Sequence, residues 1–157
     1  MPKKDLGMLA MTYGNIYVAK IAMGANPNQA VKAFVEAENY PGPSLIIAYA
    51  HCIAQGFDLA TGYQEQKKAV DCGHWPLYRF DPRLIEQGKN PLQLDSKAPT
   101  LDPEEYFYNE NRYRTLKTSK PELAAQLMAL AKKDIARRYL LMEQLSKLQV
   151  GENPSAK

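Results

Sequence analysis

Two cysteines and two histidines are the residues of this sequence best suited to bind a transition metal or to act as nucleophiles. Cys52 directly follows His51, and Cys72 lies close before His74. A four-iron cluster or a structural zinc ion takes four ligands of this kind. Because the sequence contains no Cys-x-x-Cys pair, these residues predict no complete metal site by themselves.

Three roles can be compared for Cys52. A catalytic dyad with His51 is disfavoured, because neighbouring side chains on a strand point to opposite faces of the sheet. A metal ligand is consistent with its position, since open α/β sheets bind their ligands at the carboxyl ends of strands. The spacing alone nevertheless favours a small buried apolar residue, which is the usual role of a single cysteine.

A strand that ends at His51 is predicted to position this thiol. The turn Pro41-Gly-Pro43 leads into residues 44–50, which are nearly all apolar and show no polar alternation. Such a pattern is typical of a parallel strand that is covered on both faces. Residues 16–22 form an earlier β-rich run, so we expect a parallel βαβ unit with a right-handed crossover.

The helix of this unit is predicted to run from Pro27 to near Asn39. Asn26 is a favourable cap, proline suits the first helical position, and Gln29 stands three residues after the cap. We expect its apolar side to pack against the core. That side comprises Val31, Phe34, Val35 and Ala37.

The second half of the chain is predicted to be less regular. Residues 64–72 suit a helix and residues 75–80 a strand whose aromatic side chains pack on the core. Residues 81–103 contain five prolines and glycines and predict a long irregular arm, followed by a short helix over residues 102–108.

The last element is predicted as an amphipathic helix of nearly 30 residues. Ser119 and Glu122 fit a capping box with Pro121 in the first turn, and the helix should end near Val150. The tail 152–157 is expected to be disordered. The apolar stripe would comprise Leu123, Leu127, Ala131, Ile135, Tyr139, Met142 and Leu145.

Composition limits the class of protein. The chain has 157 residues, of which 45% are hydrophobic and 24% charged, and its formal net charge is +3. This mild, scattered charge does not indicate nucleic-acid binding. No apolar stretch reaches the roughly 18 residues of a membrane span. With two cysteines and no apolar leader, we expect a reducing, cytoplasmic location.

Several stretches, taken in order, resemble the pyruvate:ferredoxin (flavodoxin) oxidoreductases, which are large thiamine-dependent iron–sulfur enzymes. The similarity runs from Lys3 to Pro99 and is looser beyond. The stretches are Lys3-Lys-Asp-Leu-Gly-Met-Leu-Ala-Met-Thr-Tyr-Gly14, Tyr17-Val-Ala19, Glu36-Ala-Glu38, Tyr40-Pro-Gly-Pro-Ser44, Ile47-Ala-Tyr-Ala50, Cys52-Ile53, Gln55-Gly56, Gly73 with Trp75-Pro-Leu-Tyr78, Asp81-Pro-Arg-Leu84, Gln87-Gly-Lys-Asn-Pro91 and Gln93-Leu-Asp-Ser-Lys-Ala-Pro99.

The resemblance implies a partial thiamine-diphosphate-binding α/β fold with a parallel βαβ core, a long irregular arm and a long C-terminal amphipathic helix. The implied divisions are residues 1–80, 81–118 and 119–157. Cys52 matches the fourth ligand of the [4Fe–4S] cluster nearest thiamine in the family, so the resemblance reverses the interpretation from spacing. Cys72 matches no family ligand and is expected to be a small buried residue, and His51 lies where the family varies and receives no role.

The implied activity is oxidative decarboxylation of pyruvate with coenzyme A to acetyl-CoA and CO2, with electrons passing through clusters to ferredoxin or flavodoxin. The magnesium–diphosphate motif of the family is absent from the sequence, so the chain is expected to be a fragment, inactive alone, of a homodimeric enzyme. The alternatives are a non-enzymatic interaction module and one subunit of a split 2-oxoacid:ferredoxin oxidoreductase.

Overall fold

The computed structural model describes residues 4–150, in which the strands form one mixed sheet of order β2-β1-β3-β4. β1 (Tyr17–Ile21) pairs parallel with β2 (Ser44–Ala48) and antiparallel with β3 (Tyr78–Phe80). β4 (Leu92–Leu94) then pairs antiparallel with β3. The helices of this part are α1 (Leu6–Met11), α2 (Pro27–Glu38), α3 (Gly62–Asp71), α4 (Arg83–Glu86), α5 (Pro103–Phe107), α6 (Asn111–Ser119) and α7 (Pro121–Ser146), with short 3-10 turns η1 (Ile53–Gln55) and η2 (Leu59–Thr61).

The predicted parallel βαβ unit is confirmed as β1–α2–β2. Asn26 caps α2, since its Oδ1 accepts a hydrogen bond of 3.0 Å from the Gln29 backbone N–H. Pro27 occupies the first turn, where its missing N–H leaves no helical bond unmade. The cap identified from the sequence therefore fixes where the crossover helix begins.

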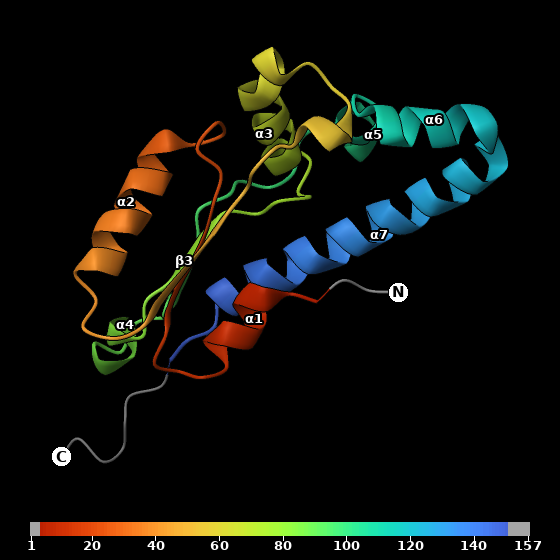
Figure 1. Ribbon diagram of the computed structural model, residues 1–157. Coiled ribbons are helices and arrows are strands. Elements are labelled where there is room, and N and C mark those ends of the chain that lie inside the picture. The colour runs from red at the N-terminus through yellow and green to blue at the C-terminus, as the bar shows by residue number, and fades with distance from the viewer. Residues whose placement is uncertain (1–3, 151–157) are drawn as a thin grey trace.

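Helices cover both faces of the sheet (Figure 1), with α2 on one side and α1 and α7 on the other. Because side chains alternate along a strand, Tyr17, Ala19 and Ile21 of β1 pack against α2. Val18, together with Phe80 of β3, packs in a separate cluster with residues of α1 and α7. α3, α5 and α6 lie together beyond one end of the sheet.

Two expectations about the βαβ unit are wrong. β2 is an edge strand, and its side chains are exposed or half-buried instead of covered on both faces. The apolar side of α2 does not face the sheet either, since Val31, Phe34 and Val35 are 51–58% exposed. Two small residues, Ala30 and Ala33, make the contact instead and allow the helix to lie close to the strands.

The segment predicted as an irregular arm is partly regular. It contains α4 and β4, and β4 joins the sheet through register pairs such as Phe80 with Leu92. Asn90 connects this segment to the distant end of α7, because its Nδ2 donates to the carbonyls of Leu145 (2.7 Å) and Leu148 (2.9 Å). The arm therefore belongs to the sheet layer.

The long C-terminal helix is confirmed, and its predicted stripe is buried at Ile135 and Met142, but the predicted cap and the first stripe residues, Leu123 and Leu127, are wrong. α7 begins after Lys120 without a side-chain cap, and the Ser119 hydroxyl donates to the Thr115 carbonyl within α6. The buried positions of α7 are Ala124, Met128, Ile135 and Met142. The predicted tail 152–157 lies outside the described residues. Within residues 4–150, no helix has both the length and the apolarity needed to cross a bilayer.

Candidate metal-ligand site around Cys52

The chain between β2 and Cys52 is held by Tyr49. Its backbone N–H donates to the Ile21 carbonyl at 2.9 Å, which extends the parallel pairing beyond β2. Its hydroxyl lies 2.6 Å from the hydroxyl of Tyr106 on α5, and its ring meets Trp75 edge to face at 5.3 Å. Burial raises the pKa of Tyr49, so the hydroxyl stays protonated near neutral pH. These contacts of Tyr49 fix the position of the chain that leads to Cys52.

The His51 side chain packs against other parts of this chain. Its Nδ1 lies 3.2 Å from the side-chain amide of Gln66 on α3, and its ring stacks edge to face with Phe57 at 5.9 Å. The ring also rests on Gly62, where a Cβ atom would come within 2.5 Å of it. His51 therefore anchors the loop to the start of α3.

Cys52 is exposed and free. It precedes the η1 turn in an extended conformation, with φ −134° and ψ 142°. Its backbone N–H donates to the Gln55 side chain at 3.0 Å, and its carbonyl accepts from the Gln55 N–H at 2.9 Å. The adjoining Ile53 side chain is 78% exposed. The loop thus presents a thiol on a backbone that is fixed from both sides.

Gly56 closes this loop against α6. Its φ of +71° lies in the left-handed region, and an added Cβ would come within 2.7 Å of the Asn111 Cβ. Its carbonyl accepts the Asn111 backbone N–H at 3.0 Å. The geometry therefore explains why glycine stands at position 56. Only glycine can adopt this backbone conformation without strain and leave room for α6.

Cys72 lies in a different environment from Cys52. It ends α3, is 1% exposed, and its Sγ is 3.5 Å from the Ala69 carbonyl. Burial raises the pKa of its thiol, which disfavours the thiolate that binds metals. The nearby His74 packs against Tyr106 and Phe107 at 5.3 and 5.0 Å. Cys72 and His74 therefore sit among aromatic core residues.

An iron–sulfur cluster can be tested against these donors. Residues 4–150 contain no group of three or more His, Cys, Asp or Glu side chains that could hold a metal ion. The exposed Cys52 thiol fits one thiolate position of a cluster, which needs four. The remaining ligands would have to come from other polypeptide, and the exposed loop allows such an approach.

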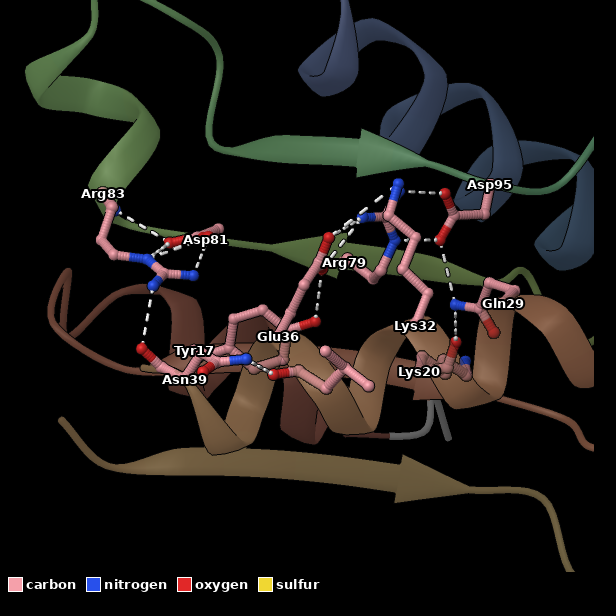
Figure 2. Close-up of polar contacts among 11 residues, drawn as sticks. Tyr17, Lys20, Gln29, Lys32, Glu36, Asn39, Arg79, Asp81, Arg83 and Asp95 are labelled. Atoms are coloured by element: carbon pink, nitrogen blue, oxygen red, sulfur yellow. Dashed lines mark hydrogen bonds and ion pairs between the residues drawn. The ribbon is translucent and has the colours of Figure 1, made fainter. Parts of the chain in front are cut away.

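The sequence did not reveal a buried polar network between α2 and the sheet (Figure 2). The Arg79 guanidinium is bound bidentately by Asp95 (2.8 and 2.9 Å) and by Glu36 (2.7 and 2.9 Å). Hydrogen bonding to Asp95 is the main cause that raises the pKa of Arg79, so this cation stays charged. Tyr17 donates to Glu36, and Gln29 to Asp95, each at 2.9 Å.

The two aspartates of residues 81–95 pair with arginines. Asp95 pairs with Arg79 of β3, and Asp81 pairs with Arg83 two residues away at 2.7 Å and also accepts its backbone N–H, as in a turn. Tyr17 and Arg79 lie on the same face of two adjacent strands. The sequence could have indicated this only if the antiparallel register of β1 and β3 had been known.

Comparisons with known proteins identify relatives over nearly the whole chain. It is 54% identical over 150 residues, 96% of its length, to a pyruvate-flavodoxin oxidoreductase of Synechocystis sp.. It is 51% identical over 149 residues, 95% of its length, to the pyruvate:ferredoxin oxidoreductase of Moorella thermoacetica. It is 50% identical over 139 residues, 87% of its length, to the mitochondrial pyruvate dehydrogenase [NADP(+)] of Euglena gracilis. No protein-family model matches.

The shared region is a small part of each relative. The chain spans 12% of the Synechocystis and Moorella proteins and 8% of the Euglena protein. The names of these proteins differ, since they specify flavodoxin, ferredoxin and NADP(+), respectively. The chain is therefore a homologue of one segment of the pyruvate-flavodoxin and pyruvate:ferredoxin oxidoreductases, matching it along almost all of its own length.

Proposed function

We propose that this chain supplies one thiolate ligand, Cys52, to a [4Fe–4S] cluster of a pyruvate oxidoreductase. The observation that carries the proposal is the exposed thiol of Cys52 at the carboxyl end of β2, in a segment about half identical to such enzymes. A single thiol that is presented outward suits a ligand set completed by other polypeptide. The buried thiol of Cys72 does not suit this role.

The reaction of the assembled enzyme would be the oxidative decarboxylation of pyruvate with coenzyme A, yielding acetyl-CoA and CO2. Thiamine diphosphate with Mg2+ supplies the electron sink for decarboxylation, and clusters carry single electrons to an acceptor such as ferredoxin or flavodoxin. We assign the β1–α2–β2 unit to the partial thiamine-binding fold, which is supported by its parallel pairing. The proposal includes a homodimeric enzyme in a reducing cytoplasm, where both free thiols would persist.

The residues of this chain would act by positioning. Tyr49 and His51 fix the approach to Cys52 through Tyr106 and Gln66, and Gly56 fixes the exit. A ligand held on such a supported loop needs little reorganisation when the cluster changes its charge. The thiolate would also set the local electrostatics of the cluster through the hydrogen bonds of its loop.

The test uses the chain together with the rest of a relative. The Moorella thermoacetica enzyme would be expressed without the matching segment and combined anaerobically with this chain, iron and sulfide. The assembly with Cys52→Ala should lack the iron of one [4Fe–4S] cluster and should absorb less at about 400 nm than the assembly with the unchanged chain. It should also lower pyruvate-dependent acceptor reduction by at least about tenfold, because removal of a ligand disables an electron-transfer step.

Cys72→Ala is the matched control, since it removes the second thiol from a site where no ligand is proposed. It should retain iron and activity even if stability falls. The chain alone, reconstituted in the same way, should hold no stable cluster. If the Cys52→Ala assembly kept its full iron content, Cys52 would not be a ligand and the proposed function would be wrong.

A further inference from the structure

The open edge of β2 has its hydrogen-bonding groups available. Tyr17 N–H donates to the Pro43 carbonyl, and Tyr49 N–H donates to the Ile21 carbonyl. In a strand, the backbone N–H and C=O of one residue point to the same side, and those of the next residue point to the opposite side. The backbone groups of residues 43, 45, 47 and 49 therefore face β1. Ser44, Ile46 and Ala48 therefore direct their N–H and C=O groups away from the sheet.

This edge carries none of the usual protection against pairing. β2 reads Ser-Leu-Ile-Ile-Ala, with neither a charged residue nor a proline inside it. Edge strands normally discourage pairing by charge, proline or shortness. The opposite edge differs, because β4 has only three residues. The continuous apolar run of β2 is instead typical of an interior parallel strand.

The helix α2 continues this apolar edge on one face of the sheet. Its Gln29 and Glu36 bind Asp95 and Arg79, so their side of the helix points toward β3 and β4 (Figure 2). At about 100° per residue, Val31 and Phe34 lie roughly opposite these two polar residues around the helix. Their side chains therefore lie on the β2 side, where they are 58% and 51% exposed.

The helix α1 continues the apolar edge of β2 on the other face of the sheet. Met8 and Met11 pack in the cluster that contains Leu92 and Met142, which places that side of α1 toward β4 and α7. Leu6 and Leu9 lie on the opposite side of the helix by the same angular argument, and they are 57% and 52% exposed. All three layers of the fold thus present apolar groups at the same end.

We infer that this β2 end, formed by Leu6, Leu9, Val31, Phe34 and the outer edge of residues 44–48, accepts an additional parallel strand with its flanking helices. The occupant is the remaining polypeptide of the oxidoreductase, so this inference rests on the proposed function. Its support is that the relatives extend far beyond the matched segment, which is 12% of their length. A parallel strand added here would end beside Cys52, bringing the following loop of the occupant to the thiol.

The proposal predicts an alternating pattern of backbone protection. In the chain alone, the Ile46 and Ala48 amides should exchange hydrogen rapidly, while the Ile47 amide should be protected by β1. On binding of the Moorella polypeptide that lacks the matched segment, exchange at Ile46 and Ala48 should slow at least about a hundredfold. Exchange resolved to single amides by mass spectrometry measures both states.

Surface variants test the flanking helices. The double variant Val31→Lys with Phe34→Lys should weaken the association at least about tenfold, because two lysines would be desolvated in the interface. Leu130→Lys on α7 is the matched control, since Leu130 is 62% exposed and lies outside the β2 end. It should leave the affinity unchanged. Urea unfolding of the free variants verifies that each remains folded.

Several outcomes would overturn the inference. These are no association, association without protection at Ile46 and Ala48, or a homodimer of this chain that already protects these amides. Cys52→Ala should associate normally. Normal protection of the edge together with full iron content in the Cys52→Ala assembly would refute the cluster ligand and leave the strand addition supported.

Discussion

Replacing Arg79 by methionine tests whether the polar network fastens α2 to the sheet. Arg79 is 6% exposed, and its guanidinium makes four hydrogen bonds of 2.7–2.9 Å to Glu36 and Asp95. Arg79→Met would leave two carboxylates of like charge close together without their shared cation. Removing one partner of a buried ion pair costs about 3–5 kcal/mol.

This cost is large compared with the total stability of a domain, about 5–15 kcal/mol. It should lower the thermal midpoint by about 10 °C and the urea midpoint in proportion. Arg137→Met is the control, because Arg137 makes an exposed ion pair of 3.1 Å with Asp134 and its side chain is 73% exposed. That change should alter stability by less than about 1 kcal/mol.

Circular dichroism during urea and thermal unfolding measures both variants at pH 7. A triple variant, Arg79→Met with Glu36→Gln and Asp95→Asn, should recover part of the loss because it removes the uncompensated charges. If Arg79→Met were as stable as Arg137→Met, the network would contribute only surface electrostatics. The reasoning that α2 is held by buried charge would then be refuted.

Two further changes test the arm and the Cys52 loop. Burial alone would raise the pKa of Asp81, but hydrogen bonds from Arg83 outweigh it and the pKa is lowered, so this pair stabilises the fold above about pH 4 and is lost as the pH falls further. Asp81→Asn should cost about 1 kcal/mol at pH 7 and flatten the acid limb of a plot of urea midpoint against pH. Gly56→Ala should cost about 1–3 kcal/mol from its backbone conformation, plus the contact with Asn111, and should speed hydrogen exchange at the Asn111 amide. Gly14→Ala, with a similar φ of +74° and no neighbour within 4 Å, should cost only the backbone part.

These two predictions have clear contrary results. An unchanged acid limb in Asp81→Asn would mean that another carboxylate governs acid unfolding. Equal costs for Gly56→Ala and Gly14→Ala would mean that α6 gives way at no cost, and that the Cys52 loop is not fastened there.

Local chemistry in the sequence was sufficient to predict the start of the crossover helix. Asn26 and Pro27 specify a cap through bonds within four residues, so no distant information was needed. The parallel pairing of β1 with β2 was also predicted, but the expected cover on both faces of β2 was wrong, because β2 lies at the edge of the sheet formed by residues 4–150. Cys52 was assigned by resemblance, since spacing alone favoured a buried thiol and the structure exposes it.

The parts that were not predicted depend on distant partners. β4 has three residues, and its place depends on distant partners such as β3, α7 and the Asp95–Arg79 ion pair. The stripe of α7 was predicted correctly at Ile135 and Met142, but near the start of the helix, where α6 is the partner, Ala124 and Met128 are buried instead of Leu123 and Leu127. Phe34 was assigned to the core because hydrophobicity indicates burial without naming the partner that provides it.

The bonds from Asn90 to the end of α7 have a consequence for the order of folding. Asn90 and Leu145 are separated by 55 residues, yet the side chain of one completes the last turn of the helix that contains the other. The Asn90 Oδ1 also accepts the Leu92 N–H at 2.8 Å, so one side chain joins the start of a strand to the end of a helix. Such sequence separation delays closure, and we expect the last turn of α7 to become ordered only after β4 has joined the sheet. During synthesis, the end of α7 would therefore become ordered last, after the sheet segment that binds it.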